Sequence, residues 1–193
     1  MDIISVFAVL AFLFSAVAYV FYIKSVLASN AQPTISSWIS WWLMDIAILA
    51  GIIAAGEMAW QMVAYIVGVV FVIGASVYKG AVVGWTRLDS VCLAIVIVAI
   101  GLWVISGDPN IAIVLSLVAI TIGTIPMVVN IWRHPAREPL VPWFFFLAGG
   151  IFGVLAIPVW NIAAALTPVW FLVLGVLNVL LISRKLRSSN VVA

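Results

Sequence analysis

Seven long apolar runs, separated by short breaks, constrain this chain more than any other feature. A helix needs roughly 17 to 25 mostly apolar residues to cross a membrane, because lipid offers the backbone no hydrogen-bond partner. With 67% hydrophobic and 7% charged residues, the chain also has too little polar surface to coat a soluble globule. We therefore predict an all-α membrane protein. Its seven transmembrane helices are expected at residues 3–23, 38–55, 60–77, 90–105, 109–132, 143–165 and 168–183.

The breaks between these runs carry residues typical of helix starts. Asp, Ser and Thr side chains accept hydrogen bonds from the free backbone N–H groups of a first turn, and proline is tolerated there. Asp89 and Ser90 therefore predict the cap of the fourth segment. Thr167, followed by Pro168, predicts the cap of the seventh.

The basic residues all fall on one face of the membrane when these segments are threaded across it. Basic residues beside short loops are retained in the cytoplasm, so we predict the N-terminus outside and the C-terminus inside. The charged residues of the opposite face are all acidic: Asp2, Glu57 and Asp108. The first segment lacks a basic leader and a small-residue cleavage site, so we expect it to be retained. The eight basic residues are Lys24, Lys79, Arg87, Arg133, Arg137, Arg184, Lys185 and Arg187.

Composition argues against several classes of function. The net charge of +2 is explained by the basic cytoplasmic face, so we predict no nucleic-acid partner. A single cysteine, Cys92, forms no intrachain disulfide, and with one histidine it leaves no zinc site. The sequence has no phosphate-binding glycine loop or nucleophile triad. We therefore expect neither an enzyme nor a cofactor.

An internal repeat organises the segments. A shift of about 105 positions lays Trp38 on Trp143 and Lys79 on Arg184, although residue identity between the copies is low. Segments one to three match five to seven, and the odd number of crossings between them gives both triplets one orientation. The predicted units are a first triplet at 1–79, a linker helix at 80–107, a second triplet at 108–185 and a short cytoplasmic tail at 186–193.

This 3+1+3 plan, with its inner loops at 32–38 (QPTISSW) and 138–143 (EPLVPW), resembles the SWEET and PQ-loop superfamily over nearly the whole chain. Three more motifs extend the resemblance: Thr86-Arg87-x-Asp89, Gly123-x-x-Pro126 and Asn130-x-Trp132. With them, the chain is similar to a group of small, functionally uncharacterised bacterial proteins related to SWEETs. The resemblance implies a bacterial cytoplasmic membrane protein that moves sugars or related small solutes down a gradient by alternating access.

The resemblance also implies roles for three residues. Pro126 and Pro158 match helix-bending prolines of the gates, and Asn178 matches an asparagine that SWEETs present to the solute. The repeat counterparts of these three positions are Phe21, Ile53 and Ile73. A proline can equally kink a transmembrane helix without gating it, and an asparagine can simply bond a neighbouring helix.

Asp45 is the most informative residue of the membrane interior. A charged carboxylate near the middle of a transmembrane helix costs about 2.5 to 3.5 kcal/mol on insertion scales, so it should face protein or water. It can bind solute, carry a proton, or fasten helices together. We predict a midplane site between the two triplets around Asp45 and Asn178. Further candidates at comparable depth are Tyr19, Trp41, Trp42, Thr121 and Thr124.

Three classes of function fit a chain of seven such helices. We favour a small-solute carrier, working alone or as a homo-oligomer, with solute and lipid bilayer as its partners. A sensor or interaction protein that keeps the fold without transport is the alternative. A retinal-binding photoreceptor is disfavoured, because residues 168–183 contain no lysine to form the Schiff base.

Overall fold

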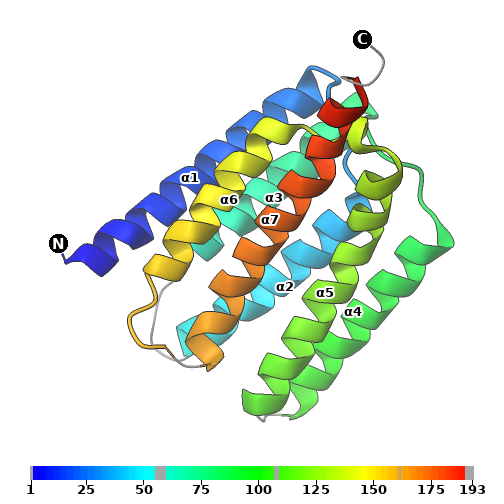
Figure 1. Cartoon of the computed structure of the whole chain (residues 1–193). Helices are drawn as coiled ribbons and strands as arrows, with labels where there is room; N and C mark the ends of the chain where they lie inside the picture. Colours follow the sequence, from blue (N-terminus) through cyan, green and yellow to red (C-terminus); the bar gives the residue numbers. More distant parts are fainter. Residues whose placement is uncertain (1, 55–59, 107–108, 161, 190–193) are drawn as a thin grey trace.

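The computed structural model describes residues 2–54, 60–106, 109–160 and 162–189, and within these ranges all regular structure is helical. This confirms the all-α class. Glu57 and Asp108, assigned above to the outer face, lie outside the described residues. The helices are α1 Ile3–Leu27, α2 Ile35–Ala54, α3 Trp60–Lys79, α4 Arg87–Ser106, α5 Pro109–Arg133, the short 3-10 helix η1 Pro135–Arg137, α6 Leu140–Leu155 and α7 Ile162–Ser189 (Figure 1).

Four stretches of helix are long and apolar enough to cross a membrane: Ile3–Leu27, Trp60–Lys79, Arg87–Ser106 and Ala164–Arg184. The other apolar helices have shorter such stretches, Ile35–Ala50, Val118–Arg133 and Leu140–Leu155. Large apolar side chains such as Phe71 and Leu180 stand on the outer surface, where a soluble protein keeps apolar patches small. The chain is therefore an integral membrane protein, and seven crossings stay a prediction.

Each helix of the bundle packs on particular neighbours. α1 lies against α3 and α6, and α2 lies against α3 and α5. α7 packs on α6 and, less extensively, on α5. α4 contacts only α5 and α2 among the described helices, so it lies at the edge of the bundle, opposite α1 (Figure 1).

The start of α4 corrects one predicted cap. The helix begins at Arg87, so Thr86 is the capping residue and Asp89 stands three positions further in. The Asp89 carboxylate accepts hydrogen bonds from the backbone N–H and hydroxyl of Thr86, while the Asp89 N–H donates to that hydroxyl at 3.3 Å. This is the reciprocal arrangement of a capping box. Ser36 of α2 also donates to Asp89, which ties the two helix starts together.

The boundary between the sixth and seventh segments differs from prediction. α6 ends at Leu155, because the residue before a proline is disfavoured in the α conformation and Pro158 follows closely. Pro158 therefore lies in the connection and bends no helix. α7 begins at Ile162, since the alanines after it are strong helix formers, so Pro168 lies inside the helix and the predicted Thr167 cap is wrong.

Glycines allow the closest helix contacts. A Cβ at Gly175 of α7 would stand 3.0 Å from the Cα of Leu147, and one at Gly150 of α6 would stand 3.0 Å from the Cα of Leu172. α6 and α7 therefore meet backbone to backbone. On α3, a Cβ at Gly68 would fall 2.3 Å from the ring of Tyr19, so only glycine leaves that ring its place.

Candidate functional site

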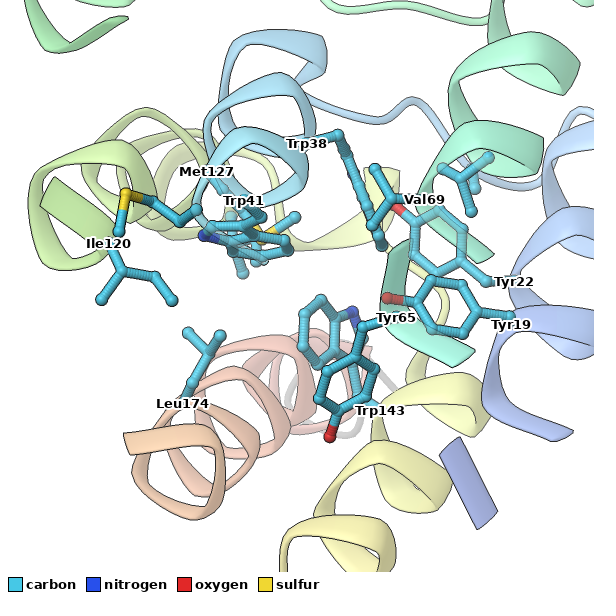
Figure 2. Packing of buried hydrophobic residues seen from close by; sticks show 14 of the residues in the cluster. Tyr19, Tyr22, Trp38, Trp41, Tyr65, Val69, Ile120, Met127, Trp143 and Leu174 are labelled. Carbon is cyan, nitrogen blue, oxygen red and sulfur yellow. The ribbon is translucent and has the colours of Figure 1, made fainter. Parts of the chain in front are cut away.

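Buried aromatic rings from five helices surround a small cavity. Figure 2 shows Tyr19, Trp41, Tyr65 and Trp143 gathering around a common space. The cavity measures about 30 Å³, which is room for one or two water molecules. Its lining residues are Tyr19 of α1, Trp38 and Trp41 of α2, Tyr65 of α3, Trp143 and Phe146 of α6, and Phe171, Leu174 and Gly175 of α7.

The rings hold one another in tilted and edge-to-face contacts. The ring centres of Tyr19 and Phe146 lie 4.9 Å apart with planes at 86°, and those of Tyr65 and Phe171 lie 4.4 Å apart. Each such pair contributes roughly 0.5 to 1.5 kcal/mol beyond its buried area. The cavity wall is thus a connected set of rings.

Three polar side-chain atoms of the lining are engaged by residues outside it, whereas the indole nitrogen of Trp38 has no hydrogen-bond partner among the described residues. The indole N–H of Trp41 donates to the Thr124 hydroxyl at 2.9 Å, and that of Trp143 donates to the Glu138 carboxylate at 3.3 Å. The Tyr65 hydroxyl accepts from the Gln61 amide at 2.9 Å. These bonds fix the orientation of the rings and leave the cavity lined mainly by their apolar surfaces.

Asp45 of α2 is not a lining residue, but it stands one helical turn beyond the lining residue Trp41. It follows Trp38 by seven residues and Trp41 by four, so the helical period places all three on one face. Asp45 is 2% exposed, and its Oδ1 atom has no hydrogen-bond partner among the described residues.

Asn178 repeats this arrangement on α7. It follows Phe171 by seven residues and Leu174 by four, so it shares their face. Its side chain is completely buried, and neither its amide oxygen nor its amide nitrogen has a hydrogen-bond partner among the described residues. An unsatisfied buried amide costs roughly 1 to 3 kcal/mol, so this side chain is poised to bind a polar group.

The remaining predicted candidates occupy three different places. Tyr19 and Trp41 line the cavity. Thr124 stands behind Trp41, accepting its indole N–H and donating to the Ile120 carbonyl at 2.7 Å. Trp42 and Thr121 are not lining residues; Thr121 is exposed and accepts from Trp170.

Pro126 lies inside α5, as predicted, and α2 compensates for it. A proline removes one helical hydrogen bond and disturbs its neighbours. The backbone N–H of Met127, the next residue, donates to the hydroxyl of Ser37 at 3.1 Å. A Cβ at Gly123, one turn earlier, would stand 2.5 Å from the Cβ of Ser40. The proline is thus held against the first turns of α2.

Sequence reasoning missed two polar groups near the cavity. Glu138, in the connection before α6, is fully buried and accepts from the Tyr22 hydroxyl at 3.0 and 2.9 Å. Gln61 donates to Tyr65 and, at 3.2 Å, to the hydroxyl of Ser15. The sequence signal that could have identified Glu138 was its place in the loop motif at 138–143. No such signal marked Gln61, which stands near the start of the apolar run 60–77.

The comparisons with known proteins add nothing to this geometry: no family model, curated protein or solved structure matches the chain. Among the described residues, no cluster of His, Cys, Asp or Glu could hold a metal ion. What the site offers is a ring-lined space flanked by one carboxylate and one amide with unused hydrogen-bonding capacity. Such a set of groups can bind a compact solute.

Proposed function

We propose that the protein is a small-solute carrier with a SWEET-like fold, which works by alternating access around the aromatic cavity. The observation that carries the proposal is the pair Asp45 and Asn178, both buried with unpartnered polar atoms, each one helical turn from a residue that lines a cavity between helices of both triplets. Intramembrane polar groups of this kind mark substrate paths by default. We also propose that the protein lies in a bacterial cytoplasmic membrane, with its N-terminus outside and its Lys and Arg residues at the inner face.

The arrangement of helices supports a parallel 3+1+3 repeat. A shift of 105 positions places the start of α2, Ile35, on the start of α6, Leu140. If α1, α2 and α3 correspond to α5, α6 and α7, the contact of α1 with α6 becomes the contact of α5 with α2, and both are present. The pairs α1 with α3 and α2 with α3 likewise map onto α5 with α7 and α6 with α7. A twofold relation along the membrane normal generates this pattern.

Reconstitution into liposomes tests the proposal. We expect flux of a small polar solute, found by screening sugars, vitamins, amino acids and organic ammonium compounds, and a reduction of about tenfold or more in Asp45→Asn and Asn178→Ala. The matched controls Ile46→Ala and Val173→Ala change exposed side chains on the same two helices and should keep full flux. Unchanged flux in both site variants, with folding intact, would refute the site.

A sensor or interaction protein is the second candidate. It is favoured by the small cavity volume and by the repeat counterparts of Pro126 and Asn178, which are Phe21 and Ile73. Co-purification of a membrane protein in a fixed ratio, together with no solute binding, would support this candidate over the carrier.

A further inference from the structure

We propose that the solute is a small organic cation of the methylated-ammonium class, bound by the aromatic rings of the cavity and neutralised by Asp45. The inference rests on the proposed carrier function and names its substrate class. Three observations carry it: the buried carboxyl of Asp45 without a basic partner, the ring composition of the lining, and the hydrogen bonds that already engage three polar atoms of the lining.

The first observation is a buried carboxylate without a basic partner. Asp45 is the eleventh residue of the twenty in α2 and is 2% exposed. The basic residues whose side chains the structure describes stand instead at helix ends and in connections. They are Lys24, Lys79, Arg87, Arg133, Arg137 and Arg184. Because a lone buried charge is costly, a cationic ligand beside Asp45 supplies the missing countercharge.

The second observation is the chemistry of the lining. Seven of its nine residues are aromatic, and the two others are Leu174 and Gly175. The faces of Trp, Tyr and Phe rings attract cations through their quadrupole, and cages of such rings are how proteins recognise quaternary ammonium groups. The lining holds rings from α1, α2, α3, α6 and α7, so a bound ammonium meets rings on several sides.

The third observation separates this ligand from a sugar. Each buried sugar hydroxyl needs a hydrogen-bond partner, and one left without a partner weakens binding strongly. The indole N–H groups of Trp41 and Trp143 are already bonded to Thr124 and Glu138, and the Tyr65 hydroxyl is bonded to Gln61. Among the indoles of the lining, only that of Trp38 has no hydrogen-bond partner in the described residues, too few free donors for the several hydroxyls of a sugar. A methylated ammonium needs few hydrogen bonds, so it matches the lining better.

The volume of the cavity sets one further condition. Space of about 30 Å³ is smaller than a trimethylammonium group, so the rings must part before the cation enters. This is the change that alternating access requires, because helices of the two triplets contribute facing rings. Tyr19 from α1 and Phe146 from α6 form such a facing pair.

Two matched probes test the proposal on the purified full-length protein. Choline and 3,3-dimethyl-1-butanol have the same shape, but the alcohol carries carbon where choline carries the positive nitrogen. We expect choline, and neither the alcohol nor glucose, to raise the melting temperature in a saturable way, since a ligand that binds the folded state stabilises it. Asp45→Asn and Trp41→Leu should each weaken choline binding by about tenfold or more. Ile46→Ala should bind choline like the unchanged protein.

Each outcome of these experiments tests a different part of the proposal. Equal stabilisation by choline and its carbon isostere would overturn the assignment of a cation, and so would full choline affinity in folded Asp45→Asn protein. If Asp45→Asn does not fold, Trp41→Leu and the probe pair still decide. If liposomes with the protein take up a neutral solute and not choline, the substrate class is wrong and the carrier stands. If no solute of the screen crosses, the carrier itself is refuted.

Discussion

The two contacts that join the proposed triplets, α2 with α5 and α1 with α6, differ in their main chemistry. At α2 and α5, small residues meet and directional hydrogen bonds fix the register, as in Ser37 with Met127 and Trp41 with Thr124. At α1 and α6, rings stack, as in Phe21 with Phe145 at 5.1 Å, and small residues meet at one place, where a Cβ at Gly149 would stand 2.7 Å from the Ser15 hydroxyl oxygen. Ring contacts tolerate small displacements, whereas hydrogen bonds lose strength quickly with distance and angle. The α2–α5 contact is therefore suited to hold its register, and the ring contacts of α1 with α6 tolerate small displacements.

The contact of α1 with α6 also includes a hydrogen bond to a carboxylate. Tyr22 of α1 donates to both oxygens of Glu138, directly before α6. The end of the aromatic contact near Glu138 thus has directional bonds, because the backbone N–H of Gln32 also donates to the carbonyl of Arg137 at 2.9 Å. Breaking this bond should show whether the rings alone hold α1 to α6.

The largest effect is expected for Gly123→Val in α5. The added Cβ would stand 2.5 Å from the Cβ of Ser40, which cannot swing away, so the two helices must separate. We expect a loss of about 3 kcal/mol in the free energy of unfolding, measured in detergent, together with loss of flux. Gly101→Val is the control, because its Cβ would meet nothing within 4 Å. Equal stability of the two variants would show that the α2–α5 contact is not tight.

A smaller effect is expected for Tyr22→Phe. The change removes the hydroxyl that donates to Glu138 and keeps the ring, which packs on Trp38 at 4.8 Å. Because hydrogen bonds to charged groups contribute more than neutral ones, unfolding should become easier by about 2 kcal/mol. Tyr78→Phe, whose side chain is exposed, should have no effect. An unchanged Tyr22→Phe protein would mean that the rings suffice to hold α1 to α6.

The smallest effect is expected for Phe21→Leu. It removes one stacked ring from α1 and leaves an apolar side chain of similar reach on a partly exposed position. We expect a loss of about 0.5 kcal/mol and unchanged flux, since neighbouring pairs such as Phe14 with Phe152 remain. A loss as large as that of Tyr22→Phe would contradict the view that this contact is adaptable.

The length of apolar runs predicted the helices well, because lipid leaves an apolar segment no alternative to a helix. The length of the runs misplaced the helix ends near Pro158 and Pro168. There the local backbone preferences determine where a helix begins or ends, whereas the hydropathy of the sequence does not change. For the site, the depth of each residue within its predicted transmembrane segment correctly identified Asp45 and Asn178 as buried polar residues. Residue depth alone did not single out Trp38 or Tyr65 for the site, because only packing decides which face of a helix meets its neighbours.

The small size of the cavity has a consequence for the membrane as an electrical insulator. Protons and ions cross a bilayer readily along a continuous file of water, and a space of about 30 Å³ holds isolated waters instead. The rings that fill the centre of the bundle therefore interrupt any continuous file of water through it. For the proposed carrier, this conformation would keep protons and ions from leaking across the membrane at rest.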